Sequence, residues 1–162
     1  MANLLKQRKN ELLNEAFAKE PALRRGKRIC GIVSLIWVIV RALDVAVELW
    51  LALTVDSAFF IPSNLFALFV VALFAKGLHD GQKACAILPI IGGAIMLLQV
   101  FSNGIYQMLG SEYILEAKIY ALAFIFASVV QILLPMFLLV TGDCKRYFAI
   151  VTEITGKMSK KQ

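Results

Sequence analysis

The sequence predicts an all-α protein, a polytopic membrane four-helix bundle with a short amphipathic helix at each terminus. Hydrophobic residues make up 60% of the chain and its mean hydropathy is +0.76, whereas soluble domains are about 45–50% apolar. Short connections leave no room for a separate soluble domain. Four segments are apolar enough to cross roughly 30 Å of hydrocarbon, and they are residues 29–53, 58–75, 84–108 and 119–140.

Residues 1–28 precede the first span and are polar and basic. They predict a short cytoplasmic helix, which Pro21 is expected to end because proline removes a backbone donor inside a helix. The apolar run that follows does not give way to a mature domain, since hydrophobicity resumes directly after Arg41. We therefore expect residues 29–53 to be a retained transmembrane helix and not a cleaved signal peptide.

The first span contains three charges, Arg41, Asp44 and Glu48. At about 100° per residue they fall within an arc of about 60° on one helical face, which Trp37 shares. A charge near the centre of a membrane helix costs about 2.5–3.5 kcal/mol. This charged stripe, whose formal sum is −1 (one cation and two carboxylates), is therefore expected to face protein or water and not lipid.

The second and fourth spans each add one amide, Asn64 and Gln131. Counted from the cytoplasmic ends at about 1.5 Å per residue, both lie near the level of Arg41, about 18 Å deep. Pro62, Pro89 and Pro135 fall within or beside spans. Breaks in membrane helices are tolerated where they line a cavity or are covered by protein.

The third span carries amides at every fourth position, Gln99, Asn103 and Gln107. On the same count Gln99 lies near the depth of Asp44, about 22 Å, and Asn103 near that of Glu48, about 28 Å. The spacing predicts that amides and carboxylates converge in the outer half of the bilayer. Amides on one face are also common links between membrane helices.

Residues 141–162 form a basic tail after the fourth span. Tyr147, Ile150, Val151 and Ile154 recur at helical spacing, which predicts an amphipathic helix in the headgroup region. Gly156 is expected to end this helix.

Lysine and arginine are concentrated in the two tails and in the loop between the second and third spans. Cations favour the cytoplasmic side of short loops, so both termini and this loop are expected inside, in a plasma or inner membrane. The formal net charge of +6 then indicates anionic lipid at the cytoplasmic face, and not nucleic acid, as its partner.

Catalytic and metal-binding motifs are not found in the sequence. The three cysteines, Cys30, Cys85 and Cys144, lack CxxC spacing, and the single histidine, His79, lies in a predicted loop. Neither a metal nor another cofactor is expected. We also expect no enzyme activity, because no histidine within the membrane could serve as a base for a nucleophile.

Two interpretations of the polar residues remain open. In the first, they line a cavity in a transport-type subunit that binds a proton, an ion or a small polar ligand. In the second, they lock helices together or dock a larger membrane partner in a non-catalytic assembly or regulatory subunit. The small bundle favours a homo-oligomer or a larger complex in either case. The candidate residues are Arg41, Asp44, Glu48, Asn64, Gln99, Asn103, Gln107 and Gln131.

Overall fold

The computed structural model describes residues 2–54, 61–102, 104–110 and 115–159. Every regular element within these ranges is a helix, which confirms the predicted all-α class. In chain order the elements are α1 (Ala2–Lys19), α2 (Pro21–Thr54), α3 (Ile61–His79), α4 (Ala84–Ser102), the 3₁₀ helix η2 (Ile105–Leu109), α5 (Leu115–Val140) and α6 (Gly142–Ser159).

Three of these helices are long and apolar enough to cross a membrane, within the described residues. They are α2 over Pro21–Leu51, α4 over Ala84–Ser102 and α5 over Leu115–Val140. The described side chains of α3 add a shorter apolar stretch, Phe66–His79. Most of the surface of the three long helices is not buried within the protein, as expected for helices in contact with lipid.

Several observed bounds differ from the predicted spans: α3 ends at His79 and not at 75, and α5 begins at Leu115 and not at 119. Two further differences have a clear local cause. The first span is part of a longer helix, because Pro21 stands at the first helical position of α2, where its fixed φ favours helix formation. The predicted helix over 84–108 is divided into α4 and η2. Gly104 lies at the division and has a left-handed backbone, with φ of 67°. This conformation ends a right-handed helical path and is available to glycine at little cost.

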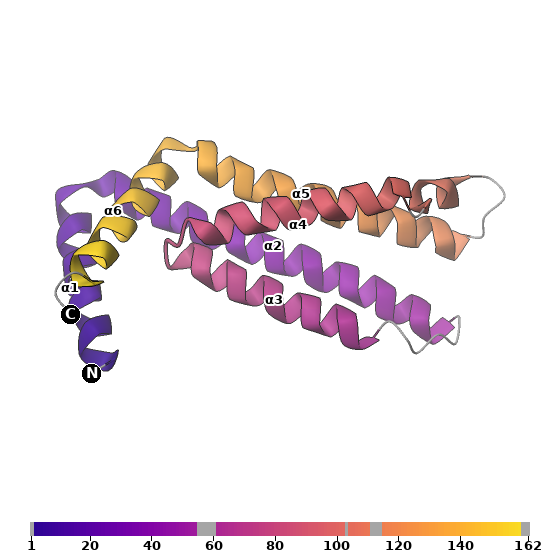
Figure 1. Ribbon diagram of the computed structural model, residues 1–162, viewed down its shortest axis with the longest axis horizontal. Helices are drawn as coiled ribbons and strands as arrows, with labels where there is room; N and C mark the ends of the chain where they lie inside the picture. Colours follow the sequence, from indigo (N-terminus) through magenta and orange to yellow (C-terminus); the bar gives the residue numbers. More distant parts are fainter. Residues whose placement is uncertain (1, 55–60, 103, 111–114, 160–162) are drawn as a thin grey trace.

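The long helices form two hairpins, α2 with α3 and α4 with α5, which meet where α2 contacts α5 (Figure 1). A tight turn joins α3 to α4, and the two helices diverge from it. Among the described residues α2 does not contact α4, because α5 lies between them. Helices α1 and α6 lie together at the end of the molecule that also holds the α3–α4 turn.

The largest buried cluster lies where the terminal helices meet α2. Leu13 and Phe17 of α1 pack with Tyr147, Phe148 and Val151 of α6 in this cluster. The rings of Phe17 and Tyr147 stack with their centroids 6.4 Å apart. The terminal helices are thereby joined to the spanning helices as one packed body.

Helix α6 departs from its prediction in two respects. Its apolar face is buried against protein and does not lie free to enter headgroups, since Tyr147, Val151 and Ile154 are at most 9% exposed. The helix also continues through Gly156 to Ser159. Gly156 has no φ in the left-handed region, so it does not form the glycine cap that the sequence suggested.

Candidate functional site

The buried face of α2 changes character along its length. From Cys30 through Val33 to Trp37 it is mostly apolar and belongs to the main buried cluster. The buried hydroxyl of Ser34 in this stretch donates to the Cys30 carbonyl oxygen. The same face continues at helical spacing into the charged stripe, where Arg41, Asp44 and Glu48 are 8%, 4% and 8% exposed. The prediction that these three charges are turned away from lipid agrees with this burial.

Among the described residues, the charged stripe contains one ion pair and two carboxylate oxygens without partners. Arg41 Nη1 donates to Asp44 Oδ2, one helical turn further along α2. Within the described part of the chain, Asp44 Oδ1 and Glu48 Oε2 are buried and accept no hydrogen bond. Unpaired buried oxygens are costly, and one arginine cannot neutralise two carboxylates. With both carboxyls ionised the stripe therefore has a formal charge of −1, and it has acceptor positions to spare.

Tyr120 of α5 lies beside this stripe. It is half-buried, and it lies within electrostatic range of Glu48, Asp44 and Arg41. Its ring also packs against Phe124, with centroids 6.0 Å apart. The phenol is the polar group that α5 brings to the charges, and the sequence analysis missed it. The signal was available, since Glu48 and Tyr120 lie about 28 Å and 30 Å from the cytoplasmic ends of the predicted spans 29–53 and 119–140, at about 1.5 Å per residue.

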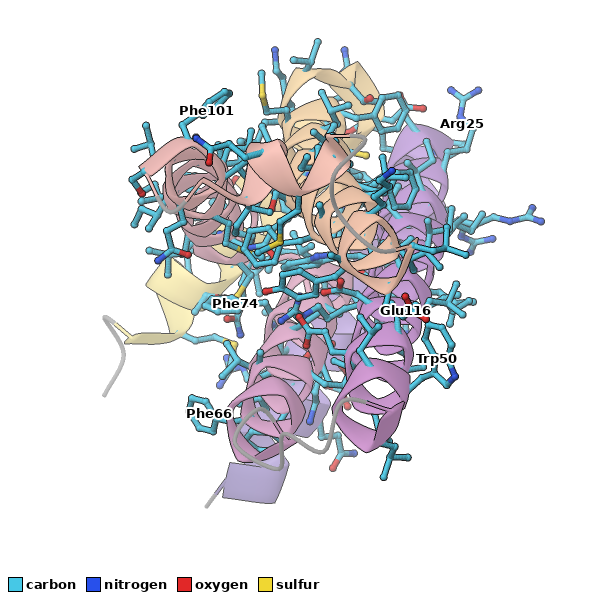
Figure 2. The ribbon with its side chains drawn as sticks, turned by 90° about the vertical axis from the view of Figure 1, so that its right-hand side faces the viewer. Arg25, Trp50, Phe66, Phe74, Phe101 and Glu116 are labelled. Atoms are coloured by element: carbon cyan, nitrogen blue, oxygen red, sulfur yellow. The ribbon has the colours of Figure 1, made fainter. Side chains whose placement is uncertain are left out.

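The outward surface around the stripe is apolar. Leu43 and Leu53 of α2 are 62% and 73% exposed. Trp50, Phe66 and Phe101, from three different helices, point away from the centre of the molecule (Figure 2). The charges thus lie inside and the large apolar side chains outside, which is the arrangement that a hydrocarbon solvent requires.

The predicted convergence of amides on the charges is not found for the residues of the third segment. Gln99 is exposed on α4, and Gln107 is exposed on η2. Both elements are separated from α2 by α5. The side chain of Asn64 and the whole of Asn103 lie outside the residues that the structure describes.

Gln131 links two helices instead of joining the charges. Its Nε2 donates to the carbonyl oxygen of Pro89 on α4 at 3.4 Å. The contact is possible because α4 approaches α5 closely at two glycines. A Cβ at Gly92 would lie 3.1 Å from Gln131 Nε2, and a Cβ at Gly93 would lie 2.7 Å from Ile132 Cγ1. Gln131 therefore stabilises the α4–α5 hairpin, in line with the helix-linking interpretation.

Two of the three cysteines lie together although 114 positions separate them in the chain. The thiols of Cys30 on α2 and Cys144 on α6 are close enough to influence each other electrostatically, and Cys144 Sγ donates to the carbonyl oxygen of Gly26 at 3.8 Å. Burial raises the pKa of the Cys144 thiol. Within the described ranges no three His, Cys, Asp or Glu residues are grouped as metal ligands would be.

The charged stripe with Tyr120 is thus the part of the molecule that combines buried charge, unpaired acceptors and a second helix. Comparison of the chain with protein-family models, with curated proteins and with solved structures finds no match.

Proposed function

We propose that this chain is a small multi-pass membrane protein of the transport type, in which Asp44 and Glu48 bind a proton or a small cation. The proposal includes four membrane spans, α2 to α5. The 19 residues of α3 reach about 28 Å at 1.5 Å per residue, close to the hydrocarbon thickness. Both termini would be cytoplasmic, because the cations of α1, α6 and the α3–α4 turn gather at one end.

One observation carries the proposal, the unequal pairing of buried charges in α2. Arg41 neutralises Asp44 through their ion pair, which leaves Glu48 with a buried oxygen that accepts no hydrogen bond from the described residues. A carboxylate in this setting is stabilised when it takes up a proton or coordinates a cation. An ion pair that only holds helices together needs no additional carboxylate. The additional carboxylate, Glu48, therefore favours a binding role over a purely structural one.

The roles of the three residues follow from their positions. Glu48 would be the group that gains and loses the proton or cation, and Asp44 Oδ1 would supply a second oxygen. Arg41 would hold Asp44 ionised and oriented. The Tyr120 phenol lies within electrostatic range of both carboxylates. A hydrogen bond from this phenol to ionised Glu48 would stabilise the site when no proton or cation is bound.

Infrared spectroscopy of the protein in lipid nanodiscs, titrated from acid to alkaline pH, tests the binding step. We expect a protonated-carboxyl band that disappears in Glu48→Gln and persists in Glu116→Gln, a matched control on α5. If proton is the ligand, proteoliposomes that contain a pH-sensitive dye should show flux that Glu48→Gln abolishes. A carboxyl band unchanged by Glu48→Gln, together with no binding of Na⁺ by calorimetry, would contradict the proposal.

The alternative is a non-catalytic assembly or regulatory subunit of a larger membrane complex. Burial of the charged stripe within the chain argues against docking through those charges, but the exposed apolar side chains of α3 and α4 favour association of some kind. Phe69 and Leu98, for example, are 60% and 67% exposed. Intact-mass determination of the natively purified protein tests this alternative. A co-purifying protein that survives substitution of Asp44 and Glu48 would favour assembly through the apolar faces.

A further inference from the structure

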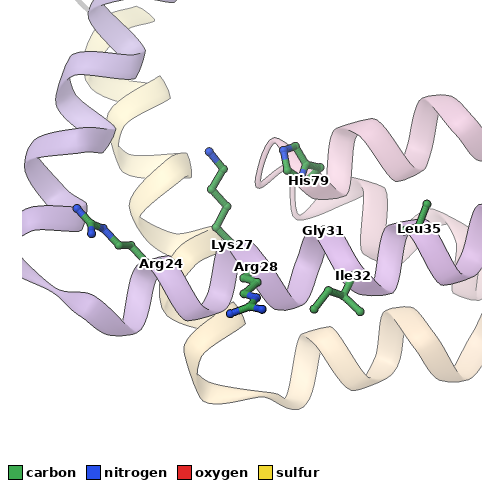
Figure 3. Close-up of a pocket in the computed structure, with 7 residues that line it drawn as sticks. All are labelled: Arg24, Lys27, Arg28, Gly31, Ile32, Leu35 and His79. Atoms are coloured by element: carbon green, nitrogen blue, oxygen red, sulfur yellow. The ribbon is translucent and has the colours of Figure 1, made fainter.

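A pocket of about 490 Å³ lies between the first turns of α2 and the end of α3. Three cations of α2 line it, Arg24, Lys27 and Arg28, and His79 of α3 lines its other side (Figure 3). Its lining residues belong to the first turns of α2 and the last residue of α3, which lie at the same end of the molecule as the terminal helices (Figure 1), whereas the charged stripe lies further along α2. The proposed cation binding makes no use of it.

The shape of the pocket depends on a close approach of two helices. Its α2 positions follow helical spacing, so that they share one face. Gly31 lies on that face, where a Cβ would stand 3.1 Å from His79 Nδ1. The backbone of His79 is held in turn by α6, because Tyr147 donates its hydroxyl to the His79 carbonyl oxygen at 2.8 Å. The wall formed by α3 is therefore fixed by tertiary contacts.

The cations of this pocket are not neutralised within the described protein. The ion pairs at this end of the molecule involve other cations, namely Arg25 with Asp143 at 3.3 Å and Arg146 with Glu20 at 2.6 Å. Lys27 holds its ammonium 5.5 Å from the centroid of the Phe17 ring, a contact that positions the charge without cancelling it. Among the residues that the structure describes, no carboxylate lines the pocket. The pocket therefore has the electrostatics of an anion site.

The pocket changes from basic to apolar along α2. Ile32 and Leu35 continue the lining beyond Gly31 and are 50% and 61% exposed. From Arg24 to Leu35 the helix rises about 16 Å at 1.5 Å per residue. A free inorganic anion would match the first part of this surface only. A molecule that joins a phosphate to a hydrocarbon chain would match both.

We propose that this pocket binds one anionic phospholipid, with its phosphate between Arg24, Lys27 and Arg28 and an acyl chain along Ile32 and Leu35. Basic pockets at the cytoplasmic ends of membrane helices suit such headgroups. The bound lipid neutralises cations that would otherwise repel each other. It also covers apolar side chains at the level where α2 leaves the membrane.

Titration of the delipidated full-length protein in neutral detergent with phosphatidylglycerol, followed by native mass spectrometry, tests the proposal. The variant Arg24→Gln/Lys27→Gln/Arg28→Gln removes the three pocket cations. The control Arg8→Gln/Lys9→Gln/Lys19→Gln removes three cations of α1 outside the pocket lining. We expect the affinity for phosphatidylglycerol to fall more than about tenfold in the first variant and less than about threefold in the control.

Two further arms separate the possible ligands and guard against misfolding. Glycerol phosphate should bind the wild type at least about tenfold more weakly than the lipid does, because it lacks the acyl chain. Gly31→Ala keeps every cation but narrows the pocket toward His79, and it should also weaken lipid binding. Equal losses in the two triple variants would overturn the proposal in favour of diffuse charge attraction. Equal affinity for lipid and glycerol phosphate would overturn it in favour of a soluble anion. Loss of the phospholipid site would leave cation binding at Glu48 intact, so the two proposals can fail separately.

Discussion

The two ends of the molecule are built in opposite ways. At the terminal-helix end, made by α1, α6 and residues 21–37 of α2, aromatic side chains such as Tyr147 and Phe148 are buried and the cations face outward. At the distal end, made by residues 38–54 of α2 and 115–128 of α5, the charges of α2 are buried and leucines such as Leu43 and Leu115 are exposed. The same helix, α2, contributes to both.

This reversal indicates that the solvent changes along the length of α2. Water stabilises exposed charge and buried apolar area, whereas hydrocarbon tolerates exposed leucine and penalises exposed charge. The change falls near Ile32 and Leu35, where the proposed phospholipid pocket turns from basic to apolar. A helix that passes through both solvents must exchange its inner and outer residue types at the boundary.

Removal of the buried arginine should have the largest effect. Arg41→Met leaves Asp44 and Glu48 together without a cation, and breaking a buried ion pair costs about 3–5 kcal/mol. We expect the free energy of unfolding, measured by sodium dodecyl sulfate titration with circular dichroism, to fall by about this amount. The variant Arg41→Met/Asp44→Leu/Glu48→Met should recover most of the loss, because no unpaired charge remains. A loss below about 0.5 kcal/mol in Arg41→Met would show that the distal charges are solvated.

A smaller loss is expected where α6 crosses α2. A Cβ at Gly26 would lie 2.3 Å from the carbonyl oxygen of Asp143, so Gly26→Ala must push the two helices apart. Overpacking of this kind costs about 1–3 kcal/mol. Gly156→Ala is the matched control, because a Cβ there meets no atom within 4 Å and alanine favours a helix. Equal stability of the two variants in the same unfolding assay would contradict the close α2–α6 packing.

The smallest effect is expected at the hydrogen bond between α6 and the end of α3. Tyr147→Phe removes the donor to the His79 carbonyl oxygen and should cost about 1 kcal/mol at neutral pH. Burial raises the pKa of Tyr147 above its usual value, so the phenol holds its proton more tightly in the folded state than in the unfolded chain. Its contribution is present below about pH 10 and is lost as the pH rises further, because the unfolded chain then releases the proton.

The pH dependence of stability in wild type and Tyr147→Phe measures this contribution. The difference in the free energy of unfolding between the two proteins should shrink from neutral pH to about pH 11. A constant difference over that interval would indicate that the Tyr147 phenol is accessible to water in the folded protein.

Periodicity along one helix was enough to identify the charged stripe. Arg41, Asp44 and Glu48 share a face by spacing alone, and the cost of charge in hydrocarbon sends that face inward whichever helix covers it. Depth counting was less successful, because equal depth does not make two helices neighbours. Gln99 lies on α4, and α5 separates α4 from α2. Tyr120 lies on α5, the helix that does contact α2, and the same depth count would have placed it near the level of Glu48.

Sequence alone determined the helical class, three of the apolar spans and the inward face of α2, because each follows from local composition and from the solvent that a segment can tolerate. Tertiary structure decided which helix faces and side chains contact each other. It buried the apolar face of α6 against α1 and α2, placed Cys30 near Cys144, and brought Tyr120 within electrostatic range of Glu48. Each of these contacts joins residues far apart in the chain. Such pairings depend on which helix surfaces fit closely, as at Gly26 and Gly93, and helix periodicity carries no information on that fit.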